Sequence, residues 1–130
     1  MGMAGLAALE ERLAHDLLTL NWRARPWLPA RSHGGQAVID VLVIGAGQAG
    51  LAAGMALAQQ GVAAVLLDRA PADYEGPWAT TARMETLRSP KELTGPALGV
   101  PSLTFRAWFE AQWGREAWAA LDKIPRLQWM

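Results

Sequence analysis

Glycines and one acid recur in the middle of the chain at a spacing that could hold a dinucleotide. Gly45, Gly47 and Gly50 form a G-x-G-x-x-G pattern, and Asp68 follows Gly50 after 17 intervening residues. Glycine lets a pyrophosphate approach the backbone closely, and the carboxylate suits the hydroxyls of an adenosine ribose. The same carboxylate would repel a 2′-phosphate, so an NADP-type cofactor is not expected at this position.

The residues around the glycines predict the strand–helix–strand order that such a site requires. Val41–Ile44 is an apolar, mostly β-branched run, typical of a buried parallel strand. A helix is expected over about 48–60, ending at Gly61, and a second strand over 63–67 leads to Asp68. The N–H groups and the positive end of the helix dipole would face the phosphates. The expected contacts in this loop are Gly45, Ala46, Gly47, Gln48, Ala49 and Gly50.

Two other interpretations also fit this stretch. A glycine-rich βαβ unit that binds no ligand has the same pattern. Residues 41–67 carry no charged side chain, which is also typical of a membrane span. The glycines fall in the register of a phosphate loop, however, and elements buried in a doubly wound sheet are equally apolar. No membrane association is therefore expected.

Composition excludes several classes of function. The 130 residues suffice for one small domain, and 12 basic residues balance 12 acidic ones, which argues against a nucleic-acid partner. The chain has no cysteine and two histidines, so no metal site is expected. No side chain is paired with another as a catalytic acid, base or nucleophile would be, so no catalytic residue is assigned. Glu10, Glu11 and Asp16 interrupt the N-terminal region, which argues against a signal peptide. A cytoplasmic location is therefore expected.

The chain is expected to divide near residue 35. Leucines recur at three- and four-residue spacing over 3–20, which predicts an amphipathic helix, and 32–35 (Ser-His-Gly-Gly) is expected to be a flexible join. Residues 1–35 are therefore interpreted as an N-terminal helical extension and linker, clamped onto the nucleotide domain. The alternative is a dimerisation helix. Residues 36–130 form the nucleotide-binding domain.

The predicted fold class is α/β, a partial Rossmann-like unit with N-terminal and C-terminal helices. Helices are expected over 105–113, with Thr104 as N-cap, and over 115–123, with Gly114 between them. No apolar β-branched run follows the second strand, so the sheet is expected to be incomplete and the domain truncated. A stripe of Phe105, Trp108, Phe109 and Gln112 would face a neighbour that the chain lacks, or else form its own core.

Two segments after Asp68 carry a family resemblance. Glu75-Gly76-Pro77-Trp78 resembles the Gly-Gly-x-Trp motif of flavin-containing and Baeyer–Villiger monooxygenases, with Glu75 in place of the first glycine. Residues 87–93, Leu-Arg-Ser-Pro-Lys-Glu-Leu, resemble the segment that passes the isoalloxazine, with Pro90 where many relatives have asparagine. The stretch 38–130 looks like the N-terminal, FAD-binding part of a bacterial FAD/NAD(P)-binding oxidoreductase.

The resemblance implies a cofactor and its contacts. FAD would be held with its ADP half on the glycine loop and Asp68, while NADPH or NADH would bind a domain absent from this chain. In such enzymes NADPH reduces the flavin, and one oxygen atom of O₂ is transferred to a small substrate. Trp78 would line the flavin, Arg69 would lie along adenine or ribose, and Arg83, Arg88 and Ser89 would bond flavin or phosphate. Ordinary packing for Trp78 and surface positions for the others are the alternatives.

Three functions follow. The first is the FAD-binding portion of an NAD(P)H-dependent, monooxygenase-like oxidoreductase, not catalytically complete by itself. The second is an NAD-dependent reductase or dehydrogenase. The third is a non-catalytic remnant or partner-binding module that uses its tryptophans for association. The expected partners are FAD, a small-molecule substrate in the full enzyme, and either a missing C-terminal half or further copies of the chain.

Overall fold

The structure is a computed structural model that describes residues 2–78, 80–93 and 95–125. It divides into two compact units, one of Asn21–Thr80 and one that combines Met1–Leu20 with Thr81–Met130. The units are described separately below. These units are groups of residues in mutual contact, and they do not test where the domains begin and end. The predicted domains 1–35 and 36–130 therefore stay a prediction.

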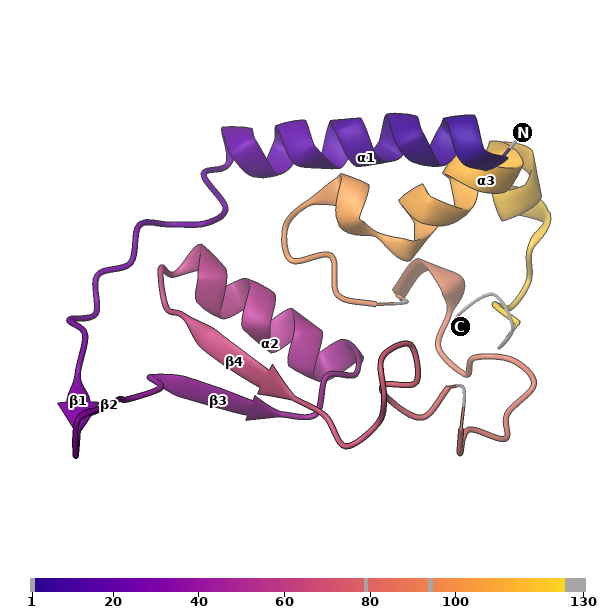
Figure 1. The fold of residues 1–130 in the computed structure, drawn as a ribbon. Helices are drawn as coiled ribbons and strands as arrows, with labels where there is room; N and C mark the ends of the chain where they lie inside the picture. Colours follow the sequence, from indigo (N-terminus) through magenta and orange to yellow (C-terminus); the bar gives the residue numbers. More distant parts are fainter. Residues whose placement is uncertain (1, 79, 94, 126–130) are drawn as a thin grey trace. The chain divides into compact units, whose positions relative to one another are not determined.

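The unit Asn21–Thr80 is built on a strand–helix–strand segment. Strand β3 (Val41–Ile44) is followed by helix α2 (Gln48–Gln59) and strand β4 (Ala64–Leu67), as Figure 1 shows. The strands are parallel, and their register pairs the first residues of both strands and the last residues of both strands. Helix α2 contacts both strands. The predicted βαβ order is confirmed, with element ends shifted by one residue.

The two faces of this small sheet differ in burial. Gly54 of α2 lies against Leu66 of β4, where an added Cβ would come 3.0 Å from a Leu66 methyl carbon, so the helix packs closely on this face. The alternate residues are exposed, in the case of Ile44 by 86%. The exposed positions of the other face are Leu42, Ile44, Val65 and Leu67. In the described part of the chain this sheet has two strands, and its second face is uncovered within the unit.

An extended segment before the sheet caps the C-terminal end of α2. Gly61 takes φ +70° after the helix, and its N–H donates to the Ala58 carbonyl at 3.1 Å. The same carbonyl accepts from the N–H of Ala24 at 3.2 Å. The Trp27 indole N–H donates to the Gln60 carbonyl at 2.9 Å. The tryptophan- and proline-containing segment therefore adds hydrogen bonds to carbonyl groups at the C-terminal end of the helix.

The predicted join near residue 35 takes the form of a hairpin. Strands β1 (Ser32–His33) and β2 (Gln36–Ala37) pair in antiparallel fashion, and all four strand residues are exposed. The turn residues Gly34 and Gly35 have φ values of +56° and +78°. Two successive residues with positive φ form the tight turn that matches strand twist, which is why two glycines give a hairpin here.

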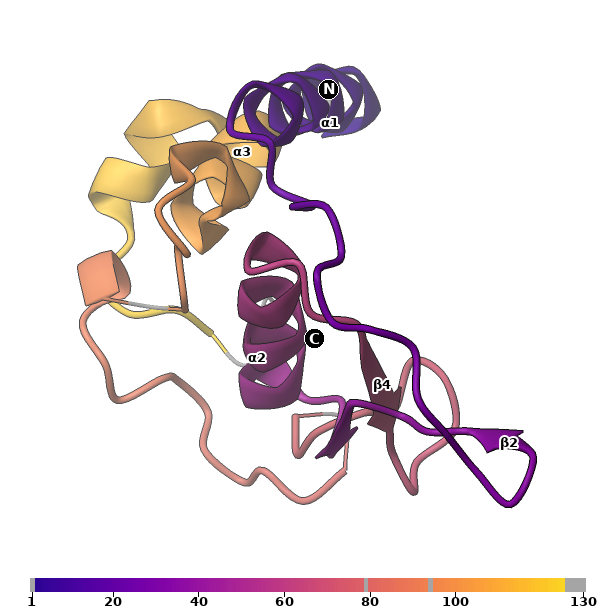
Figure 2. The ribbon, with the colours of Figure 1, turned by 90° about the vertical axis from the view of Figure 1, so that its left-hand side faces the viewer.

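In the second unit, helix α1 (Gly2–Thr19) packs on helix α3 (Phe105–Ala120) and on the short 3-10 helix η2 (Pro101–Leu103). Figure 2 shows α1 nearly end-on beside α3. A Cβ added to Gly5 would lie 1.9 Å from the Ala111 carbonyl oxygen, so the helices touch backbone to backbone. The Ser102 hydroxyl donates to the Asp16 carboxylate at 2.5 Å. The N-terminal helix is thus bound to distant residues of its own chain.

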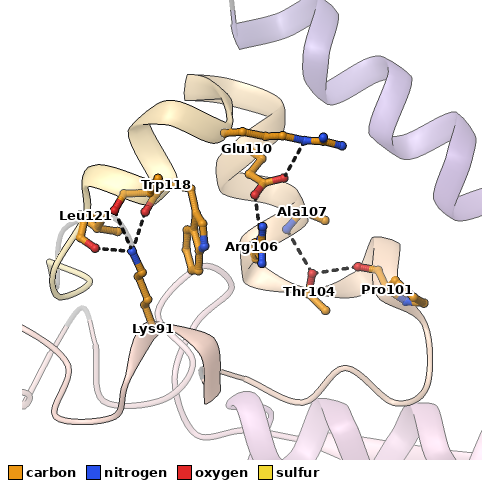
Figure 3. A network of polar contacts seen from close by, with 10 residues as sticks. Lys91, Pro101, Thr104, Arg106, Ala107, Glu110, Trp118 and Leu121 are labelled. Carbon is orange, nitrogen blue, oxygen red and sulfur yellow. Dashed lines mark hydrogen bonds and ion pairs between the residues drawn. The ribbon is translucent and has the colours of Figure 1, made fainter.

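Helix α3 follows the prediction closely. The Thr104 hydroxyl accepts from the Ala107 N–H at 3.1 Å, which confirms the predicted N-cap (Figure 3). Gly114 has φ +87° and ψ +166°, so the helical path is interrupted there as predicted. The second helical stretch ends at Ala120, three residues earlier than predicted.

The aromatic residues of α3 pack within this unit. Phe109 and Trp118 are buried, and their ring centroids lie 5.6 Å apart. The Phe105 and Trp108 rings are 5.2 Å apart. The interpretation that this stripe faces a neighbour absent from the chain is therefore wrong for Phe109, and the alternative of a core within the chain holds. Trp113 stays 47% exposed.

Two kinds of feature are absent from the described ranges. No helix there is long and apolar enough to cross a membrane. Among the same residues, no group of three or more histidine and acidic side chains lies together as metal ligands would.

Candidate functional site

The loop between β3 and α2 begins with a glycine in a left-handed conformation. Gly45 has φ +104°, and no atom lies within 4 Å of the position that its Cβ would take. Its N–H donates to the Leu67 carbonyl at 2.7 Å, which extends the pairing of β3 with β4 by one residue. Glycine is required here by backbone conformation rather than by space.

The third glycine of the pattern is required by space. A Cβ added to Gly50 would lie 1.8 Å from the Gly45 carbonyl oxygen and 3.5 Å from a Val43 methyl carbon. The first turn of α2 therefore rests directly on the end of β3. This is the role that the sequence predicts for the third glycine of a dinucleotide-binding loop.

The middle glycine faces another part of the chain. Gly47 is the N-cap of α2, and its φ of −70° is open to any residue. A Cβ added to Gly47 would lie 3.3 Å from the Cα of Gly76, which is closer than most such contacts. The predicted reason for this glycine is the close approach of a pyrophosphate. In the structure its side-chain position is also restricted by the loop that contains Gly76.

The N-terminus of α2 offers backbone donors. No side chain caps it, and the Leu51 N–H, which donates to the Gly47 carbonyl at 2.9 Å, makes the first bond of the helix. The preceding N–H groups, those of Gln48, Ala49 and Gly50, have no partner within a helix of this geometry. Gln48 and Ala49 are exposed. Unbonded N–H groups and the positive end of the helix dipole together favour an anion at this point.

The predicted acid ties the end of β4 to the glycine loop. The Asp68 carboxylate accepts from the Ala70 N–H at 2.8 Å with one oxygen and from the Ala46 N–H at 2.7 Å with the other. These two bonds, that of Ala70 first, hold the pKa of Asp68 below its ordinary value of 3.8. Each oxygen keeps capacity for a further bond, so the carboxylate can still receive ribose hydroxyls.

The structural bond between Asp68 and Ala46 is absent from the sequence analysis. An acid placed directly after the second strand is the signal that could have predicted it, because the ends of two paired parallel strands lie at the same edge of the sheet.

The remaining predicted residues fall into two groups. Arg69 is exposed next to Asp68, and Trp78 is partly buried in the turn that the Thr80 N–H closes on the Pro77 carbonyl at 3.2 Å. Both share the unit of the glycine loop. Arg83, Arg88 and Ser89 are exposed residues of the other unit. Their contact with a cofactor stays a prediction.

Arg88 and Ser89 line an open cavity of about 590 Å³ in their own unit. Beside it, the Lys91 ammonium donates to the carbonyls of Trp118 at 2.7 Å and Leu121 at 2.5 Å (Figure 3), with a further bond to Ala119 at 3.3 Å. The three protons of this lysine therefore serve the C-terminus of α3, where a cation is favourable. Sequence reasoning missed this role, because the residues are about 30 positions apart.

Comparison with known proteins adds the family context. Residues 38–93 match the family described as FAD binding domain. The chain is 54% identical over 126 residues to a protein from Xanthomonas campestris pv. campestris that is named FAD-dependent urate hydroxylase. This match covers 96% of the chain and 27% of the relative, so the chain spans about a quarter of the relative's length. No solved structure matches the chain significantly.

The segment that matches the FAD binding domain contains the whole arrangement described above, from the glycine loop through Asp68 to Trp78. An α/β dinucleotide-binding fold agrees with the parallel strand pair and its connecting helix. The predicted resemblance of the chain to the FAD-binding part of flavin-dependent oxidoreductases is confirmed, and FAD is the cofactor to which both matches point.

Proposed function

We propose that this chain is the FAD-binding portion of an NAD(P)H-dependent, monooxygenase-like oxidoreductase, and that β3, α2 and β4 form its Rossmann-like unit. One observation carries the proposal. The glycine loop leads into the uncapped N-terminus of α2 and is bonded through Ala46 to Asp68, within a segment that matches the FAD binding domain. The match supports FAD as the cofactor, and the helix N-terminus beside Asp68 supports this loop as its site.

The residues present fit the ADP half of FAD. The diphosphate would accept from the N–H groups of Gln48, Ala49 and Gly50, and no neighbouring residue lies over the Cβ position of Gly45. The ribose hydroxyls would donate to the remaining lone pairs of Asp68. Arg69, exposed beside that carboxylate, would lie along the adenosine.

Other predicted contacts belong to the flavin half. Trp78 would stand beside the isoalloxazine or the ribityl chain, and Arg83, Arg88 and Ser89 would hydrogen-bond flavin or phosphate. These roles are carried by the resemblance to flavin monooxygenases and by the exposure of the three polar side chains.

The reaction class comes from the relative. Its name describes a hydroxylase, and hydroxylation adds one oxygen atom to a substrate. Bound FAD would supply the redox chemistry, with NADPH or NADH as the reductant; the residues of this chain would bind the cofactor and orient it. Because the chain spans 27% of the relative, the reaction, the substrate and the second nucleotide site are proposals for the whole protein. Urate is the first substrate to test.

A second candidate function is partner binding without catalysis. The exposed face of the β3–β4 sheet favours it, since Ile44 and Leu67 are more than half exposed there. Apolar patches of this kind are typical of association surfaces. A chain that binds neither FAD nor NADH, but associates, would support this candidate.

The test is the visible absorbance of the purified chain with and without added FAD. We expect structured, shifted flavin bands in the wild type. Gly47→Val should abolish them, because a branched side chain would collide with the Gly76 backbone and occupy the approach to the helix N-terminus. Ala63→Val, at an exposed residue just before β4, is the matched control and should retain the bands. A colourless wild type that binds NADH instead would favour a reductase.

A further inference from the structure

The loop that follows β4 returns to the glycine loop and touches it. The contact joins the backbone of Gly76 to that of Gly47: a Cβ on Gly47 would be 3.3 Å from the Gly76 Cα, and a Cβ on Gly76 would be 3.5 Å from the Gly47 Cα. Two glycines face each other, so the two backbones approach without an intervening side chain.

The returning loop is held in its conformation by local bonds. Gly76 has φ +75°, a left-handed value that favours glycine, and its carbonyl accepts from the Thr80 hydroxyl at 3.3 Å. Before it, Asp73 has φ +72°, and the Tyr74 N–H closes a turn on the Pro71 carbonyl at 3.1 Å. The chain thereby turns twice within ten residues and brings Gly76 to the N-cap of α2.

We propose that Gly76 is a positioning residue, which seats the loop 75–78 against the glycine loop and makes it a second wall of the diphosphate site. The inference rests on the proposed FAD-binding function and extends it. The N-cap Gly47 directly precedes the unbonded N–H groups of α2, so any side chain at position 76 that points toward Gly47 would enter the space of an anion bound there.

The first experiment compares two asparagine substitutions. Asparagine tolerates a left-handed backbone, so Gly76→Asn keeps the turn and adds a side chain toward Gly47. Gly99→Asn is the matched control, because Gly99 has φ +79° and no atom within 4 Å of its Cβ position. FAD affinity, measured by flavin fluorescence, should fall about tenfold or more in Gly76→Asn and stay within about twofold in Gly99→Asn.

Binding of a series of nucleotides distinguishes a change in the wall of the diphosphate site from a general loss of folding in Gly76→Asn. ADP carries the diphosphate and AMP lacks its second phosphate group. Gly76→Asn should therefore lower the affinity for ADP more than the affinity for AMP, as measured by a tryptophan-fluorescence titration. If Gly76→Asn weakens the binding of ADP and AMP equally, the proposal is overturned. The same holds if the wild type binds FAD and Gly76→Asn binds it with unchanged affinity.

The second experiment tests the contact without any ligand. The thermal midpoints of Gly47→Ala, Gly76→Ala and the double variant form a double-mutant cycle. Because both methyl groups would enter the same narrow space, the double variant should deviate measurably from the sum of the two single shifts. Additive shifts would contradict the contact. A wild type that binds no FAD would instead refute the proposed function, while the cycle would still report on the contact.

Discussion

At position 50, a single hydrogen in place of a side chain decides how closely a helix can lie on a strand. Gly50→Ala would place its methyl carbon 1.8 Å from the Gly45 carbonyl oxygen, so backbone must move. We expect a loss of about 1–3 kcal/mol in the free energy of unfolding. Urea denaturation measures it.

Gly54→Ala is the matched control in the same helix. Its methyl carbon would meet a Leu66 methyl at 3.0 Å, and that side chain can shift, while alanine favours the helix over glycine by about 1 kcal/mol. We expect the control to be much less destabilised. Equal losses at both positions would show that the contact between Gly50 and Gly45 has no special weight.

The Asp68 carboxylate gives a second prediction at this scale. Its pKa is lowered in the folded protein by the N–H groups of Ala70 and Ala46, so the ionised form stabilises the fold. This contribution is fully present above the ordinary value of 3.8 and is lost as the pH falls through the lower, folded value. The thermal midpoint of Asp68→Asn should lie below that of the wild type by a constant amount between about pH 5 and 8.

Below pH 3.8 the two midpoints should converge, because the protonated wild-type carboxyl resembles the neutral amide. A difference that persists unchanged in acid would mean that the charge of Asp68 is not what the two N–H groups recognise. The same variant should bind FAD about tenfold more weakly if the ribose uses this carboxylate.

Among the elements, helix α3 depends on a residue outside it. Lys91→Met keeps the length of the side chain and removes the ammonium that donates to Trp118 and Leu121. We expect a loss of about 1 kcal/mol, since the helix C-terminus loses a favourable charge and the hydrogen bonds of Lys91, including the longer one to Ala119. Thermal unfolding followed by far-UV circular dichroism measures it. Lys123→Met, at an exposed residue after the same helix, should change the midpoint little.

The elements themselves were largely predictable, because their signals are local. A continuous apolar, mostly β-branched run indicates β3, glycine marks the end of α2, and Thr104 with Gly114 delimits the first half of α3. The segment with Gly34 and Gly35 is predicted only as a flexible join, although two adjacent glycines also specify the two-residue turn of the observed hairpin.

The contacts between elements could not be predicted in the same way. Ser102 and Asp16 are 86 positions apart, and nothing in either local sequence points to the other. Gly76 belongs to a family motif that the sequence shows. Its contact with Gly47, however, depends on two turns that bring the chain back to the glycine loop. For the candidate site, sequence therefore located the loop and the acid, and the structure supplied what joins them.

For the molecule as a whole, the exposed sheet face is the surface through which we expect any association to occur. Ile44 is the most exposed of its apolar residues, at 86%, and lies at the end of β3. Ile44→Thr keeps a β-branched residue and removes apolar surface. We expect this variant to remain folded and to show less concentration-dependent association in size-exclusion chromatography with light scattering.

Thr86→Ser, in which one exposed β-branched residue of the other unit loses a methyl group, serves as the control and should associate like the wild type. If Ile44→Thr and the wild type have the same mass at every concentration, the sheet face does not mediate association.

The hairpin of β1 and β2 has a practical consequence. Its turn at Gly34 and Gly35 is exposed, and no atom lies within 4 Å of the Cβ position of either glycine. Exposed tips of small residues are where proteins accept inserted sequence. A short peptide that carries a fluorophore, placed between these glycines, would therefore label the unit Asn21–Thr80 while leaving both chain ends native, and would test the proposed binding of FAD by energy transfer to the flavin.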